Sequence, residues 1–187
     1  MIYPIVAYGD TVLKKKASAI DFSQLDVPKL AADMFETMYL AHGVGLAAPQ
    51  IGKSIRLFVV DAEAMDEEKL KGFKKVFVNA EMIAETGELW PYEEGCLSIP
   101  GIRGEVMRHN TIRIKYQDEN GQQHEDTFDG MAARVIQHEY DHIEGKLFTD
   151  YFSPLRKRLL KAKLTNISKG IADNEYKMSF PLLSKAR

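Results

Sequence analysis

The sequence predicts an α+β fold, in which antiparallel or mixed β-sheets pack around a central helix and another helix follows near the C-terminus. Segments with the residue pattern of short strands occupy most of residues 55–128. A helical segment begins near residue 129 or 130 and ends at Gly145, and a second helical pattern covers about residues 153–170. Strands grouped ahead of helices, instead of alternating with them, are typical of α+β domains.

Length and composition favour one globular domain. The chain has 187 residues, of which 45% are hydrophobic and 28% are charged. We expect a single catalytic domain over residues 1–170, with its core at about 1–150, a helix at about 153–170 and a loosely held tail at 171–187. The net charge of −2 and the lack of a long apolar run predict no membrane partner.

The chain contains one cysteine, so an internal disulfide is excluded. Residues 1–6 lack the basic region and apolar core of a signal peptide. Both observations are typical of the cytoplasm, where thiols stay reduced, and we therefore expect a cytoplasmic protein.

The first elements are an arm and a helix. Residues 1–25 are expected to form the arm, in which Asp10 caps a short turn. The first clear helix spans about residues 28–42, because Pro28 suits a first helical turn and Gly43 suits the position after a helix end.

An unusual loop is expected at residues 43–52. Its three glycines, small residues and proline argue against a helix or an ordinary strand. A phosphate-binding loop is excluded, because the Lys-Ser/Thr ending is missing. The composition predicts backbone that approaches a ligand, with the Gln50 amide beside it; a plain connector is the alternative.

The strands are expected to be short and separated by turns. Gly87 marks one turn, residues 94–101 form a second unusual loop, and residues 118–121 form a hairpin turn. The expected strands cover residues 55–60, 76–79, 82–84, 111–116 and 123–128.

The central helix carries the sequence His-Glu-x-x-His at residues 138–142. Histidines four residues apart share one helix face, so His138 and His142 can bind one metal ion. Glu139 is too near His138 to be a comfortable third ligand, but it is well placed to accept a proton from water on that metal. The motif is typical of zinc-type hydrolases.

A catalytic metal site needs a third protein ligand, and three sources are considered. A thermolysin-like glutamate on the next helix is missing, because residues 156–164 are basic or apolar. A metzincin-like third histidine is missing from residues 143–148. Cys96 remains, and we predict that it is the third ligand; the alternative is a small buried hydrophobe.

Three segments together resemble, in order and spacing, the three motifs of peptide deformylase. They are residues 43–50 (Gly-Val-Gly-Leu-Ala-Ala-Pro-Gln), 94–98 (Glu-Gly-Cys-Leu-Ser) and 137–142 (Gln-His-Glu-Tyr-Asp-His). Residues 8–13 also resemble the N-terminal segment of that family, so the resemblance spans about residues 1–150.

The resemblance implies an enzyme that removes the N-formyl group from the initiator methionine of newly made polypeptides. Cys96, His138 and His142 would hold one divalent metal ion, with Fe²⁺ as the native ion and Zn²⁺, Ni²⁺ or Co²⁺ able to replace it. A metal-bound water would attack the formyl carbon, with Glu139 as general base. The Gln50 side-chain amide and the Leu97 backbone N–H would stabilise the oxyanion together with the metal.

The resemblance also implies a groove in which the peptide adds a strand and its methionine side chain enters an apolar pocket. Arg134 stands where an apolar pocket residue is expected. The expected substrate-binding residues are Val44, Gly45, Tyr92, Gly95, Arg103, Met131 and Val135.

The C-terminal helix is expected to dock through an apolar face formed by Leu155, Leu159, Leu160, Leu164 and Ile167. Its basic side carries Arg156, Lys157, Arg158, Lys161 and Lys163. The resemblance suggests that this side contacts the ribosome, where the substrate emerges; a solvated basic face is the alternative. We expect a monomer that acts on N-formyl-methionyl peptides. Two other functions stay open, namely a different His-Glu-x-x-His metallopeptidase and an inactive metal-binding module associated with the ribosome.

Overall fold

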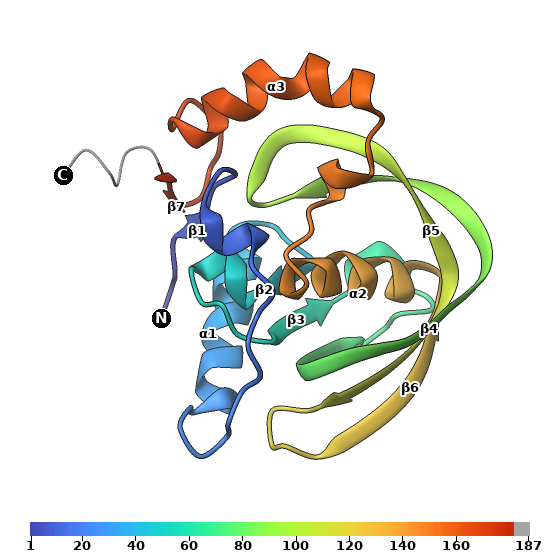
Figure 1. The fold of residues 1–187 in the computed structure, drawn as a ribbon. Helices are drawn as coiled ribbons and strands as arrows, with labels where there is room; N and C mark the ends of the chain where they lie inside the picture. Colours follow the sequence, from blue (N-terminus) through green and yellow to red (C-terminus); the bar gives the residue numbers. More distant parts are fainter. Residues whose placement is uncertain (182–187) are drawn as a thin grey trace.

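The computed structural model describes residues 1–181 and has an α+β architecture built on a curved sheet (Figure 1). Five strands follow the order β2-β3-β4-β5-β6, and each neighbouring pair is antiparallel. They are β2 Gly45–Ala47, β3 Leu57–Asp61, β4 Lys74–Cys96, β5 Ile99–Gln117 and β6 Gln123–Asp129. Two short strands, β1 Ile5–Val6 and β7 Met178–Ser179, pair in parallel. The predicted fold class is confirmed.

The described part of the chain contains three α-helices: α1 Val27–Leu40, α2 Gly130–Ile143 and α3 Pro154–Ser168. Short 3-10 turns lie at Thr11–Lys14, Ala48–Ile51, Glu63–Met65 and Phe148–Tyr151. Asp10, Asp26 and Ser153 cap the elements that follow them by accepting backbone N–H groups. Across residues 1–181, none of the helices has the length and apolar character needed to cross a membrane.

Helices α1 and α2 cover opposite faces of β3. Side chains of a strand alternate between the two faces of a sheet. Leu57 and Val59 accordingly join the buried cluster under α1, whereas Phe58 and Val60 join the cluster under α2. Helix α2 lies inside the curve of the sheet, where it packs against β2, β3, β5 and β6 (Figure 1). This packing fixes the helix that carries the His-Glu-x-x-His motif.

Three expectations about the strands are wrong. Gly87 is not in a turn: it lies within β4 with φ +78°, where the register with β5 shifts between Thr86 and Leu89. Such a bulge suits glycine, because positive φ costs it little. Residues 94–101 are not one loop, since β4 runs to Cys96 and β5 begins at Ile99. Residues 43–52 do include a strand, because Gly45–Ala47 pairs with β3 at the edge of the sheet.

The expected docking of α3 holds only for its C-terminal half. Leu164 and Ile167 are buried, but Leu155 and Leu159 are 64% and 74% exposed. Two of its basic residues bind β5 instead, although all five stay exposed: Arg156 donates to the Arg103 carbonyl at 3.0 Å, and Lys163 donates to the Gly101 carbonyl. These bonds leave the first leucines of α3 at the surface.

Contrary to the expectation of a loosely held tail, residues 171–181 pack on the body of the protein. Met178 and Ser179 pair with Ile5 and Val6, beside the N-terminus (Figure 1). Ala172, Met178 and Phe180 pack against the buried cluster that includes Ile99. The remaining part of the expected tail, residues 182–187, lies outside the described residues.

Candidate active site

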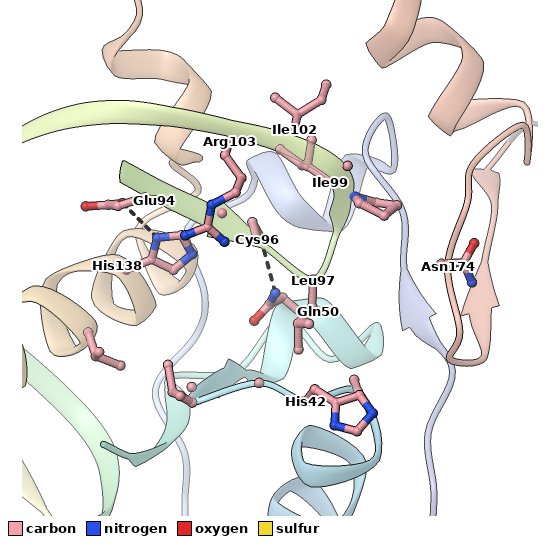
Figure 2. Close-up of a pocket in the computed structure, with 18 of the residues that line it drawn as sticks. His42, Gln50, Glu94, Cys96, Leu97, Ile99, Ile102, Arg103, His138 and Asn174 are labelled. Carbon is pink, nitrogen blue, oxygen red and sulfur yellow. Dashed lines mark hydrogen bonds and ion pairs between the residues drawn. The ribbon is translucent and has the colours of Figure 1, made fainter. Parts of the chain in front are cut away.

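Most of the predicted site residues line one cavity of about 640 Å³, and His142 lies just outside that lining, beside Cys96. Its walls come from the segment before and within β2, the end of β4, the start of β5, helix α2 and residues 173–176. Figure 2 shows side chains from these elements facing one another across the cavity. Residues that are far apart in the sequence therefore meet here because the sheet curves around α2.

The three predicted metal ligands come together. The ligand atoms of Cys96, His138 and His142 all lie within 4.8 Å of one another. Cys96 Sγ is 3.4 Å from His142 Nε2, and the two imidazole rings are 5.2 Å apart at their centroids. The histidines lie one helical turn apart on α2, and Cys96 reaches them from the end of β4. A thiol and two imidazoles at these distances can hold one metal ion.

Glu94 orients His138 from behind the site. Its Oε2 lies 2.9 Å from His138 Nδ1, which leaves Nε2 directed to the cluster (Figure 2). Arg108 donates to both carboxylate oxygens, at 2.7 and 3.1 Å, and Arg134 donates to Oε1 at 3.0 Å. All of these side chains except His138 are at most 4% exposed. The sequence analysis missed this network, although carboxylate partners of metal-binding histidines are common.

The network determines the charges behind the site. Burial alone would raise the pKa of Glu94, but hydrogen bonds with His138 and Arg108 outweigh it and hold that pKa well below its usual range. Burial alone would lower the pKa of His138, but contacts with Cys96 and Glu94 raise it well above its ordinary value. Burial, together with the positive charges of His138 and Arg108, holds the pKa of His142 well below its ordinary value, so this second imidazole is kept neutral.

Glu139 lies beside the cluster and is 4% exposed. Burial raises the pKa of Glu139 to about 7, and its Oε2 has no hydrogen-bond partner within residues 1–181. A side chain at Gly45 would overlap the Glu139 carboxylate, which explains why glycine occupies that position of β2. This carboxylate can therefore exchange a proton with a small molecule in the cavity.

The Gln50 side chain is fixed at both ends. Its Oε1 accepts from the Ala47 N–H at 2.8 Å. Its Nε2 then points at Cys96 Sγ and Ser98 Oγ, at 3.5 and 3.4 Å (Figure 2). The amide is 1% exposed, so it offers a preorganised N–H donor to the cavity.

The cavity brings together most of the expected substrate-binding residues. Val44, Gly45, Tyr92, Gly95, Arg103 and Val135 line it, as do Leu97 and Gln50. Met131 does not: it lies one turn nearer the start of α2 than Val135 and is not part of this lining. Arg103 donates to the Glu93 carboxylate at 3.3 Å on the surface, so it also forms the ion pair expected of a surface arginine.

Arg134 is a buried part of the pocket wall. Its side chain is 2% exposed and lies over the Trp90 ring at 4.3 Å. It donates to Glu94 and to the backbone carbonyls of Val106 and Trp90. The Arg134 guanidinium is thus neutralised by Glu94 inside the pocket wall, and it also helps to hold Glu94 in place.

The wall of the cavity that follows α3 was not anticipated from the sequence. Asp173, Asn174, Glu175 and Tyr176 follow α3 and return to the site. Their sequence contains no motif, and only the folded path of the chain places them there.

Comparisons with known proteins agree with this geometry. The family model for polypeptide deformylase matches residues 2–158. A peptide deformylase from Cytophaga hutchinsonii is 59% identical over 182 residues, covering 97% of this chain and 99% of that protein. One from Christiangramia forsetii is 55% identical, with both chains fully covered.

Solved structures give the same result. The crystal structure of peptide deformylase from Thermus thermophilus matches with a TM-score of 0.81 and 41% identity, covering 91% of this chain and 99% of that one. A peptide deformylase from Legionella pneumophila matches with a TM-score of 0.79 and 40% identity, covering 90% and 96%. The chain therefore belongs to the polypeptide deformylase family of hydrolases.

Proposed function

We propose that this protein removes the N-formyl group from the initiator methionine of newly made polypeptides by metal-dependent hydrolysis. The observation that carries the proposal is the convergence of Cys96, His138 and His142 next to a buried carboxylate, Glu139, beside a cavity bordered by an edge strand. Membership of the deformylase family supplies the class of substrate. The products are formate and a peptide with a free α-amine.

The residues present fit one divalent metal ion. Sulfur and two imidazole nitrogens suit Fe²⁺, which we propose as the native ion, and they also accept Zn²⁺, Ni²⁺ or Co²⁺. The fit is supported by Glu94, which holds His138 in the tautomer that keeps Nε2 free for a metal. When bound, the ion supplies Lewis acidity that lowers the pKa of water and polarises the formyl carbonyl.

We propose that Glu139 moves the proton. Its carboxylate accepts a proton from the attacking water and later donates it to the nitrogen that leaves when the C–N bond breaks. Burial raises the pKa of Glu139, and a raised pKa suits this double role because it strengthens the carboxylate as a base toward the water. Gly45 leaves the space that this carboxylate occupies.

Two N–H donors are proposed to stabilise the oxyanion that forms at the formyl carbon. One is Gln50 Nε2, which is held by the Ala47 bond of the same side chain. The other is the backbone N–H of Leu97, next to Cys96 in the connection between β4 and β5. Donors that are already in place stabilise the transition state without reorganisation.

The peptide is proposed to bind as a strand along the unpaired edge of β2. Strand β2 is at the edge of the sheet, so one side of its backbone has no partner strand within residues 1–181. Val44, Tyr92 and Val135 are proposed to contact the methionine side chain. Gly45 and Gly95 allow close approach of peptide backbone, and Arg103 is proposed to contact its downstream end.

The proposal extends to the surroundings of the reaction. We propose a monomer that works in the cytoplasm, where new polypeptides are made, and that contacts the ribosome through α3. The exposed Leu155 and Leu159 next to the basic side chains of α3 support a contact surface there.

The function is tested by incubating anaerobically purified, metal-analysed protein with a formyl-Met peptide and with its unformylated counterpart. The expected result is formate release from the first peptide and no reaction with the second. Hydrolysis of a peptide bond in either peptide would instead indicate a metallopeptidase, and metal content without turnover would indicate an inactive module.

A further inference from the structure

The segment that follows α3 is anchored at both of its ends, and its middle lies at the active site. The chain turns at Gly170, and the Ile171 N–H donates to the Asn166 carbonyl of α3 at 2.9 Å. Further along, Lys177 and Ser179 accept backbone N–H groups from the N-terminal arm, at 2.9 and 2.8 Å. Residues 173–176 between these anchors form one wall of the cavity that also contains Cys96 and Gln50. The family match ends at residue 158, so this wall lies beyond the matched region.

Tyr176 connects this wall to the turn that contains Leu97. Its hydroxyl donates to the Leu97 carbonyl at 2.7 Å. Tyr176 and Leu97 also pack against the same buried cluster beside α1. The backbone of Tyr176 is itself held, because the Asn174 side-chain amide donates to the Tyr176 carbonyl at 2.6 Å. A short bond from a side chain fixed in this way restricts the rotation of the peptide group between Leu97 and Ser98. That group shares the Leu97 Cα with the peptide group that carries the Leu97 N–H.

The turn containing Leu97 is held from two directions. Cys96 pairs with Ile99, so Leu97 and Ser98 alone connect β4 to β5. The Ser98 carbonyl accepts the Tyr8 N–H at 2.8 Å, from the N-terminal arm. The Leu97 carbonyl accepts the Tyr176 hydroxyl, from the C-terminal segment. Segments from opposite ends of the chain thus fix two consecutive carbonyls next to a proposed metal ligand.

We propose that Tyr176 is a positioning residue, whose hydroxyl holds the Leu97 backbone so that the Leu97 N–H is aimed at the oxyanion. This inference rests on the proposed function, which gives that N–H its role in the transition state. The hydroxyl acts through Leu97 and not on the substrate. The oxyanion charge develops only in the transition state. A misplaced Leu97 N–H therefore reduces kcat and leaves ground-state binding nearly unchanged.

The test is Tyr176→Phe in the full-length, metal-loaded protein, because this change removes one hydroxyl and keeps the ring. We expect kcat on a formyl-Met peptide to fall about three- to tenfold, the effect of losing one hydrogen bond, and KM to change by less than about twofold. The matched control is Tyr39→Phe. Tyr39 donates to Asp61 at 2.6 Å and lies outside the cavity lining, so its kcat should equal that of the wild type.

A second measurement detects the hydrogen bond itself, independently of the reaction rate. The carbonyl ¹³C NMR signal of Leu97 should shift in Tyr176→Phe and stay in place in Tyr39→Phe. Wild-type kcat in Tyr176→Phe, a change confined to KM, or an equal loss of kcat in Tyr39→Phe would each overturn the positioning role. A wild-type protein that releases no formate would instead contradict the proposed function, and the role of Tyr176 with it.

Discussion

Glu94 Oε2 lies 2.9 Å from His138 Nδ1, and Glu94 precedes Cys96 by two residues on the same strand. One short segment of β4 therefore supplies a proposed metal ligand and also the carboxylate that orients another. Arg108 and Arg134 both donate to that carboxylate and hold it in place. The metal site is thus continuous with a buried network of charges, and changes in the network should alter metal affinity.

Glu94→Gln should weaken metal binding by about 10- to 100-fold, the usual cost of losing the carboxylate partner of a metal-bound histidine. It should also destabilise the fold by roughly 3–5 kcal/mol, because buried arginines lose their partner. Chelator competition and denaturant unfolding measure the two effects. Glu93→Gln is the control, since Glu93 is exposed and pairs with Arg103 only at the surface. Equal metal affinity in Glu94→Gln and Glu93→Gln would contradict the orienting role.

Cys96→Ser should sharply reduce metal occupancy, because a neutral hydroxyl is a much poorer ligand than a thiolate. The fold should remain, since Cys96 is the last residue of β4 and serine is similar in size. Metal content after dialysis tests whether Cys96 is a ligand. Circular dichroism of the same sample checks that the variant is folded. Full occupancy in the folded variant would exclude Cys96 as a ligand.

Gln50→Ala should lower kcat by about 100-fold or more, near 3 kcal/mol, with a much smaller change in KM. The alanine also leaves the Ala47 N–H without its partner, so stability must be measured in parallel. Gln50→Glu keeps the acceptor for Ala47 and removes the donor, and should lose a comparable rate. An effect limited to KM in both variants would make Gln50 a binding contact only.

The sequence predicted the features that local spacing controls. The metal-binding helix, with His138 and His142 one turn apart, follows from a four-residue interval, and Gly130–Ile143 agrees with the expected bounds. Cys96 was predicted as the third ligand by excluding other ligands and by the resemblance to a family. Its approach to His142 depends on the long curved hairpin of β4 and β5, which a local pattern does not specify.

The wrong predictions also arise where long-range contacts, and not the local sequence, decide the structure. Gly87 indicated a turn, because a glycine with polar neighbours is compatible equally with a turn and with a bulge in a long strand. Leu155 and Leu159 indicated docking, whereas Arg156 and Lys163 bind backbone carbonyls of β5 and turn the leucines outward. Tyr176 could not be predicted, since its contact with Leu97 joins residues 79 positions apart.

Arg158→Glu with Lys161→Glu tests the proposed contact between α3 and the ribosome. These two are chosen because the other basic residues, Arg156, Lys157 and Lys163, donate to backbone carbonyls of the body. Activity on a short formyl-Met peptide should be unchanged, and co-sedimentation with bacterial ribosomes at low salt should fall, because contacts to phosphates depend strongly on charge. Unchanged co-sedimentation would leave the basic side of α3 as a solvated surface.

The most direct measurement of the central claim is formate release from a formyl-Met peptide by wild-type protein and by Glu139→Gln, at equal measured metal content. The amide keeps the shape of the carboxylate and leaves the three proposed ligands in place, but it cannot accept a proton. We predict that kcat falls by about 10²–10⁴-fold or more, the range for a positioned general base. A Glu139→Gln protein that carries its metal and releases formate at the wild-type rate would contradict the account.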